Sequence, residues 1–77
     1  MAVLTIYHCT AINGGAAGAL DAINGDWLLD GDRGFVVTSA GVFSVWWLDA
    51  DYNTPDNGTT IIAPDSNAGT KRWRKCT

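Results

Sequence analysis

Aspartates supply the residue pattern in this sequence that comes nearest to a metal-binding loop. Asp49, Asp51 and Asn53 alternate as the first ligands of an EF-hand calcium loop do. Such a loop needs Gly at its sixth position and Glu at its twelfth. The chain has Thr54 and Thr60 there. We therefore interpret the segment as a solvated turn and expect no metal site.

Three further aspartates, Asp26, Asp30 and Asp32, lie close together in the sequence and could gather around a cation. Asp and Gly at such spacing are more typical of a tight turn, since the short carboxylate bonds its own backbone. We interpret this cluster as a turn as well. The sequence thus provides no reason to expect a metal or another cofactor.

Catalysis would need a nucleophile or a base, and the chain has one histidine, His8, beside Cys9. Both fall in an expected strand, where adjacent side chains point to opposite faces. A Cys–His pair built from strand neighbours therefore has poor geometry. No Ser or Asp stands at an informative distance from His8. We expect a structural imidazole and no enzymatic activity.

The two cysteines, Cys9 and Cys76, lie near opposite ends of the chain. Neither belongs to a CxxC or Cys/His cluster, so the pattern does not indicate a zinc site. Three states stay open: free thiols in a reducing cytosol, a bridge that closes nearly the whole chain, or a cross-link between subunits. A bridge within the chain would require the two Cα atoms to lie within about 7 Å.

Four tryptophans are a heavy load for 77 residues. Each aromatic side chain can bury roughly 150–250 Å², and a chain this short forms one domain, residues 1–77, with a thin core. Some indole surface is therefore expected to meet other protein. The alternative is a sugar-binding platform, to which only one of Trp46 and Trp47 could contribute because they alternate along a strand.

The charge is unevenly distributed along the sequence. The net charge is −3, yet four of the five cations, Lys71, Arg72, Arg74 and Lys75, fall within the last seven residues. We expect this basic end to meet an acidic surface on a partner protein. Nucleic acid is not expected as a partner, because the acidic body would repel a phosphate backbone.

No stretch approaches the roughly 18 apolar residues that a membrane span needs, so no membrane partner is expected. The N-terminus lacks the basic and apolar regions of a signal peptide. We expect synthesis in the cytoplasm.

Apolar periodicity predicts an α+β domain that is mostly β: a small antiparallel sheet or barrel-like β domain with one short helix. In the central segment, Ser44, Trp46 and Leu48 share one face, while Phe43, Val45 and Trp47 share the other. Both faces are apolar, so this strand is either central in the fold or uses its second face as an interface. The expected strands span residues 2–9, 35–38, 42–48, 59–63 and 70–76, and the expected helix spans residues 16–23.

The segment from Leu20 to Arg74 resembles a module of bacteriophage tail-fibre and tailspike proteins and related virion accessory proteins. The shared order is ALDAI, DGD, FVVT, LDAD, DNGTTIIAP and GTKRW. These motifs stand at Ala19–Ile23, Asp30–Asp32, Phe35–Thr38, Leu48–Asp51, Asp56–Pro64 and Gly69–Trp73. The resemblance implies a non-enzymatic, β-rich adaptor on the particle that is usually trimeric.

We expect no larger receptor-binding or depolymerase domain after the module, and therefore a small virion part that is synthesised in the host cytoplasm: a capsid decoration or cement protein, or a tail adaptor. Its expected partners are further copies of itself, as a homotrimer, and other virion proteins such as capsid or tail. The alternative function is a carbohydrate-binding module that contacts the host cell envelope. The expected interface residues are Phe43, Trp46, Trp47, Trp73, Lys71, Arg72 and Arg74.

Overall fold

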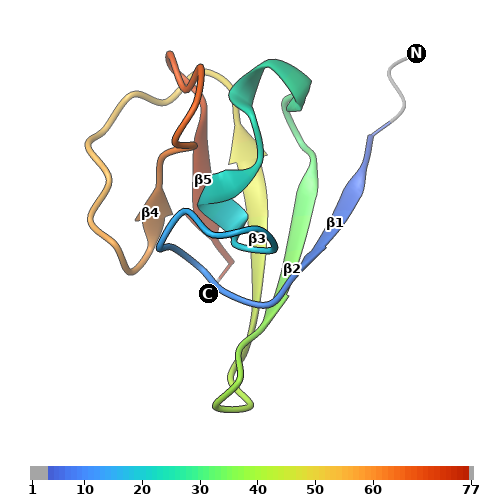
Figure 1. The fold of residues 1–77 in the computed structure, drawn as a ribbon. Coiled ribbons are helices and arrows are strands. Elements are labelled where there is room, and N and C mark those ends of the chain that lie inside the picture. Colours follow the sequence, from blue (N-terminus) through green and yellow to red (C-terminus); the bar gives the residue numbers. More distant parts are fainter. Residues whose placement is uncertain (1–3, 77) are drawn as a thin grey trace.

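The computed structural model of the protein describes residues 4–76, and they form one five-stranded sheet. The strand order is β1-β2-β3-β5-β4 (Figure 1). β1 runs parallel to β2, and the other neighbours are antiparallel. The strands are β1 (Ile6–Cys9), β2 (Arg33–Val37), β3 (Phe43–Asp49), β4 (Ile61–Ile62) and β5 (Arg72–Lys75).

The prediction of a mostly β domain is confirmed, with a mixed rather than purely antiparallel sheet. The strands expected over residues 35–38 and 42–48 form a hairpin as β2 and β3, where Val37 pairs with Phe43 and Arg33 with Trp47. The fourth expected strand is reduced to two residues. Of the first expected strand, residues 2 and 3 lie outside the described residues.

The predicted helix over residues 16–23 is wrong. Gly15 and Gly18 have φ of 73° and 92°, in the left-handed region, and Ala19 is extended. The segment pairs with the chain leaving β1 instead: the Leu20 N–H donates to the Ala11 carbonyl and the Thr10 N–H to the Gly18 carbonyl, both at 2.9 Å. Apolar spacing alone could not reveal this competing partner.

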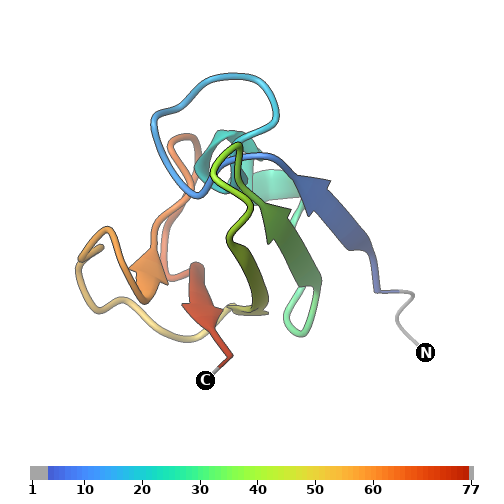
Figure 2. The same cartoon turned by 90° about the horizontal axis from the view of Figure 1, so that it is seen from below.

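Two short 3₁₀ turns take the place of the helix, η1 (Leu20–Ala22) and η2 (Gly25–Trp27). They belong to the connection from β1 to β2, residues 10–32, which lies against one face of the sheet (Figures 1 and 2). We call this connection the cover layer. It supplies Leu20 and Leu28, both fully buried, to the core.

The core lies between the cover layer and the inner face of the sheet. Trp46 and Trp73 are its largest members, and both are fully buried. The Trp46 indole N–H donates to Ser44 Oγ at 2.8 Å, and Tyr7 packs edge-on against Trp73. The remaining buried sheet residues of this cluster are Cys9, Val36, Leu48 and Ile62.

Asp32 joins the cover layer, β1 and β2 at one point. Its buried carboxylate accepts the backbone N–H groups of Thr5 and Leu29, each at 2.9 Å. A buried carboxylate that accepts two such bonds is well satisfied. This aspartate, which we expected in a turn, therefore holds the end of the cover layer against the sheet.

Candidate functional site

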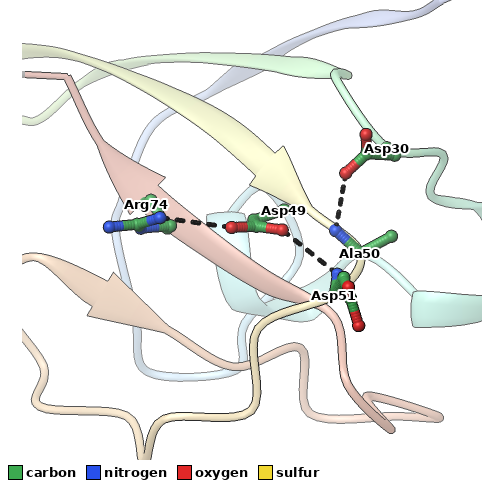
Figure 3. Close-up of polar contacts among 5 residues, drawn as sticks. All are labelled: Asp30, Asp49, Ala50, Asp51 and Arg74. Carbon is green, nitrogen blue, oxygen red and sulfur yellow. Dashed lines mark hydrogen bonds and ion pairs between the residues drawn. The ribbon is translucent and has the colours of Figure 1, made fainter.

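The carboxylates of the aspartates that resemble a calcium loop bind backbone N–H groups and an arginine of the protein itself (Figure 3). Asp49 accepts the Asp51 N–H at 3.1 Å with one oxygen and pairs with Arg74 at 3.2 Å through the other. Asp30 accepts the Ala50 N–H at 2.8 Å. These contacts fix the turn that follows β3, which agrees with the interpretation of the segment as a turn.

The DNG turn before β4 has a comparable structural role. Asn57 Oδ1 accepts the backbone N–H groups of Thr59, Thr60 and Ile61 at 2.9–3.0 Å. Asp56 accepts the N–H groups of Gly58 and Ala63, at 2.7 and 2.8 Å. The most distinctive motif of the sequence is thus a backbone-capping turn that sets the direction of β4.

His8 and Cys9 lie on opposite faces of β1, as the strand alternation predicted. His8 is exposed and packs against Phe35, with ring centroids 5.8 Å apart. Cys9 is buried in the core, and this burial raises the pKa of its thiol. A thiol with a raised pKa is a poor nucleophile near neutral pH.

Cys9 and Cys76 are both free thiols, so the bridge within the chain does not form. Cys9 belongs to β1, whereas Cys76 directly follows β5, three strands away in the sheet. Three strand spacings amount to about 14 Å, twice the separation that a disulfide tolerates. Cys76 is exposed, so a cross-link between subunits would have to use this thiol.

The basic end is largely engaged within the protein. Lys71 donates to the Gly25 carbonyl at 2.7 Å, and Arg72 donates to the carbonyls of Thr54, Gly69 and Lys71. These side chains fasten loops to β5. No sequence pattern indicated this use, because the acceptors are backbone carbonyls of other segments.

The four tryptophans divide into two groups. Trp46 and Trp73, both expected at an interface, are core residues with no exposed surface. Trp47 is half-buried on the opposite face of β3, and Trp27 in η2 is 69% exposed. Only Trp27 and Trp47 can therefore contact a partner in this conformation.

The face of the sheet turned away from the cover layer is the candidate site, and we call it the outer face. No helix or strand of the described residues covers it (Figure 2). The loop after β3 contacts it, where Tyr52 and Thr54 meet the side chains of Arg74 and Arg72. The register of the strands places side chains from all five strands on it. These residues are Ile6, His8, Arg33, Phe35, Val37, Phe43, Val45, Trp47, Asp49, Ile61, Arg72 and Arg74.

The aromatic rings on and beside the outer face form two groups. Phe35 contacts Phe43 edge-on at 6.1 Å, and Phe43 and Val37, paired across the hairpin, are 59% and 51% exposed. Further along, the Arg74 guanidinium lies 5.2 Å from the Trp47 ring and 4.2 Å from the Tyr52 ring. Exposed aromatic side chains interleaved with arginine are typical of protein interfaces.

Charge separates the two sides of the molecule. The outer face carries three arginines and one aspartate, a formal charge of +2. The cover layer carries no cation, because Arg33 is the first Lys or Arg of the chain. Its four aspartates are Asp21, Asp26, Asp30 and Asp32.

The outer face contains only part of the interface that we expected from the sequence. Of the seven expected residues, four lie on it: Phe43, Trp47, Arg72 and Arg74. The structure adds Arg33, Phe35 and Val37, which we had not expected there. The strict alternation of these three residues in β2 was the signal that could have found them.

Within residues 4–76 the surface holds no pocket, and no three His, Cys, Asp or Glu side chains are grouped to hold a metal ion. No helix in this part of the chain is long and apolar enough to span a bilayer. Searches against family models, curated proteins and solved structures find no match to this chain.

Proposed function

We propose that the protein is a non-enzymatic structural component of a bacteriophage virion that acts through protein–protein contacts at its outer face. The observation that carries this proposal is the apolar and arginine-rich sheet face, whose Ile6, Val37 and Phe43 are more than half exposed and which no helix or strand of the described residues covers. Interfaces concentrate aromatic side chains and arginine in this way. The motif order shared with tail-fibre and tailspike modules supports the placement on a phage particle.

Within that function the protein serves as a capsid decoration or cement protein or as a tail adaptor, and it assembles as a homo-oligomer, with a trimer as the expectation from the resemblance. Capsid or tail proteins are its further partners. The basic end contributes to the outer face through Arg72 and Arg74, whereas Lys71 binds a carbonyl of the cover layer.

The proposal is tested on purified particles from the phage or prophage whose genome carries the gene. Quantitative mass spectrometry is expected to find the chain in fixed proportion to a capsid or tail protein, and cryo-electron microscopy is expected to show its density. A Phe43→Ser variant is expected to be lost from particles, while Val42→Ser, equally exposed at 56% but outside the outer face, is retained. Particles that never contain the chain would refute the function.

A carbohydrate-binding module is the second candidate, and one observation favours it. Trp27 presents an indole that is 69% exposed, next to the exposed carboxylate of Asp26, and an exposed indole beside a polar group is the minimum for stacking on a sugar. Host polysaccharide would then quench the fluorescence of the parent protein and not that of Trp27→Phe with Trp47 intact. Unchanged fluorescence in the parent would end this alternative.

A further inference from the structure

A second exposed apolar surface lies on the cover layer. Leu28 is extended and fully buried, so its neighbours Trp27 and Leu29 point the other way, out of the molecule. They are 69% and 48% exposed. Two exposed carboxylates, Asp26 and Asp30, flank them in the sequence. We call Asp26, Trp27, Leu29 and Asp30 the Trp27 surface.

The Trp27 surface and the outer face are complementary in two respects. Each presents exposed aromatic and aliphatic groups, Trp27 with Leu29 on one and Phe43 with Val37 on the other. Their charges are opposite, since two aspartates face solvent on the Trp27 surface and the outer face carries a formal +2. Complementary charge fixes the choice and orientation of a partner.

Two outer faces do not fit one another in the same way. A face-to-face pair would bring the Arg33 and Arg72 side chains of one copy towards arginines of the other, and like charges brought together oppose association. The outer face is therefore expected to bind an acidic partner surface that has an exposed apolar group at its centre, which matches its positive charge and its exposed Phe43 and Val37. A second copy of this chain presents such a surface on its cover layer.

We infer that the protein associates head to tail, with the Trp27 surface of one copy docked on the outer face of the next. This inference names the occupant of the outer face and so rests on the proposed function's use of that face as an interface. The two surfaces share no residue, so each copy can engage one neighbour through each surface. Such a heterologous contact builds a ring where the rotation closes and a filament where it does not.

The test uses two variants that each lose one side of the contact. Trp27→Ser and Phe43→Ser change exposed residues, so the fold is expected to survive, which circular dichroism checks. The parent is expected to show a mass of several copies by sedimentation at about 10–100 µM, where micromolar contacts are populated. Each variant alone is expected to sediment as a monomer, and Val42→Ser, the matched control, as the parent does.

Mixing the two variants decides the arrangement. The Phe43→Ser copy keeps its Trp27 surface and the Trp27→Ser copy keeps its outer face, so an equal mixture is expected to form one-to-one dimers and nothing larger. A parent that is monomeric throughout this range overturns the inference, as does a mixture that stays monomeric. If a variant fails to fold, the parent still decides: an assembled mass that does not fall with added salt contradicts the charge-matched contact.

An experiment that refutes the head-to-tail contact does not by itself refute the proposed virion function. A monomeric parent that is nevertheless found in purified particles leaves the virion role standing and removes the head-to-tail contact. Assembly in solution with no chain in the particles does the reverse.

Discussion

At the scale of single residues, Asp and Asn side chains, among them aspartates that resembled ligands of a metal site, accept hydrogen bonds from backbone N–H groups. Asn57 shows this most clearly, because its side-chain oxygen accepts three consecutive N–H groups, those of Thr59, Thr60 and the first residue of β4. Removing a hydrogen-bond partner of this kind typically costs about 0.5–1.5 kcal/mol. We expect Asn57→Ala to lower the free energy of unfolding by that amount in urea titrations.

Two further variants distinguish the loss of the Asn57 oxygen acceptor from the general effect of a substitution in this loop. Asn57→Asp keeps an oxygen acceptor and is expected to lose less than Asn57→Ala. Asn53→Ala changes an exposed amide in the same long loop and is expected to change stability by less than about 0.5 kcal/mol. Equal losses in Asn57→Ala and Asn53→Ala would show that the three bonds do not stabilise the turn.

Asp21 is a buried carboxyl whose pKa is raised, chiefly because burial disfavours its charged form. The nearby charges of Asp65 and Asp56 raise the pKa further, and the hydrogen bond from the Gly15 N–H lowers it in part. The folded state therefore binds this proton more tightly than the unfolded chain, whose pKa is near 3.8. Stability consequently falls as the pH rises from that value through the folded pKa.

We therefore expect Asp21→Asn, which keeps an acceptor for Gly15 and removes the charge, to be more stable than the parent at neutral pH. The difference should vanish at about pH 3, where the carboxyl is protonated in both states. Urea unfolding at both pH values measures it, with the exposed Asp51→Asn as control. A variant less stable than the parent at neutral pH would show that ionised Asp21 is favourable where it lies.

At the scale of elements, the sequence pattern predicted the position of most strands. The strands expected over residues 35–38, 42–48 and 70–76 appear as β2, β3 and β5. The two-faced apolar pattern of β3 left a central strand and an interface strand as alternatives, and β3 is the central strand of the sheet. The helix over residues 16–23 failed because the glycine conformations and the bond from Leu20 to Ala11 depend on tertiary pairing. The loop-fastening bonds of Lys71 and Arg72 have no sequence signal, since their acceptors are backbone carbonyls.

The docking of η2 depends on a backbone-to-backbone approach that only glycine permits. Gly25 donates to the Ser66 carbonyl at 2.8 Å, and a Cβ atom there would lie 2.1 Å from the Asn67 carbonyl oxygen. The clash is with backbone, so it cannot be relieved by a rotamer change. We expect Gly25→Ala to cost at least about 1–3 kcal/mol, as overpacking does.

Thermal unfolding measures this loss, and Asp26→Ala, the exposed neighbour, is the control expected to stay within about 0.5 kcal/mol of the parent. Because η2 carries Trp27, Gly25→Ala is also expected to shift the Trp27 fluorescence. Parent-like stability in Gly25→Ala would mean that η2 does not pack against residues 66–67 as described.

At the scale of the whole molecule, the sheet keeps its two thiols apart and gives them different reactivity. Cys9 lies in the core with a raised thiol pKa, and Cys76 is exposed after β5. A disulfide-exchange reagent is expected to titrate one thiol in the native protein and two in denaturant, and Cys76→Ser should abolish the native reaction. If oxidation links copies, Cys76→Ser should remove the cross-linked band on non-reducing gels while Cys9→Ser keeps it.

The separation of charge across the sheet leads to a prediction that involves the whole molecule. If the acidic cover layer of one copy meets the outer face of the next, Asp26→Lys and Arg33→Asp should each reduce the assembled mass, because each places like charges across the contact. Mixed in equal amounts, the two variants regain two attractive pairings: the introduced lysine with the introduced aspartate, and the native Asp26 of one variant with the native Arg33 of the other. The mixture is therefore expected to recover an assembled mass close to that of the parent, with the two variants alternating. Asp51→Lys makes the same charge change outside the cover layer and should assemble as the parent does. Equal loss in Asp51→Lys and Asp26→Lys would show that net charge, and not a docked surface, governs association.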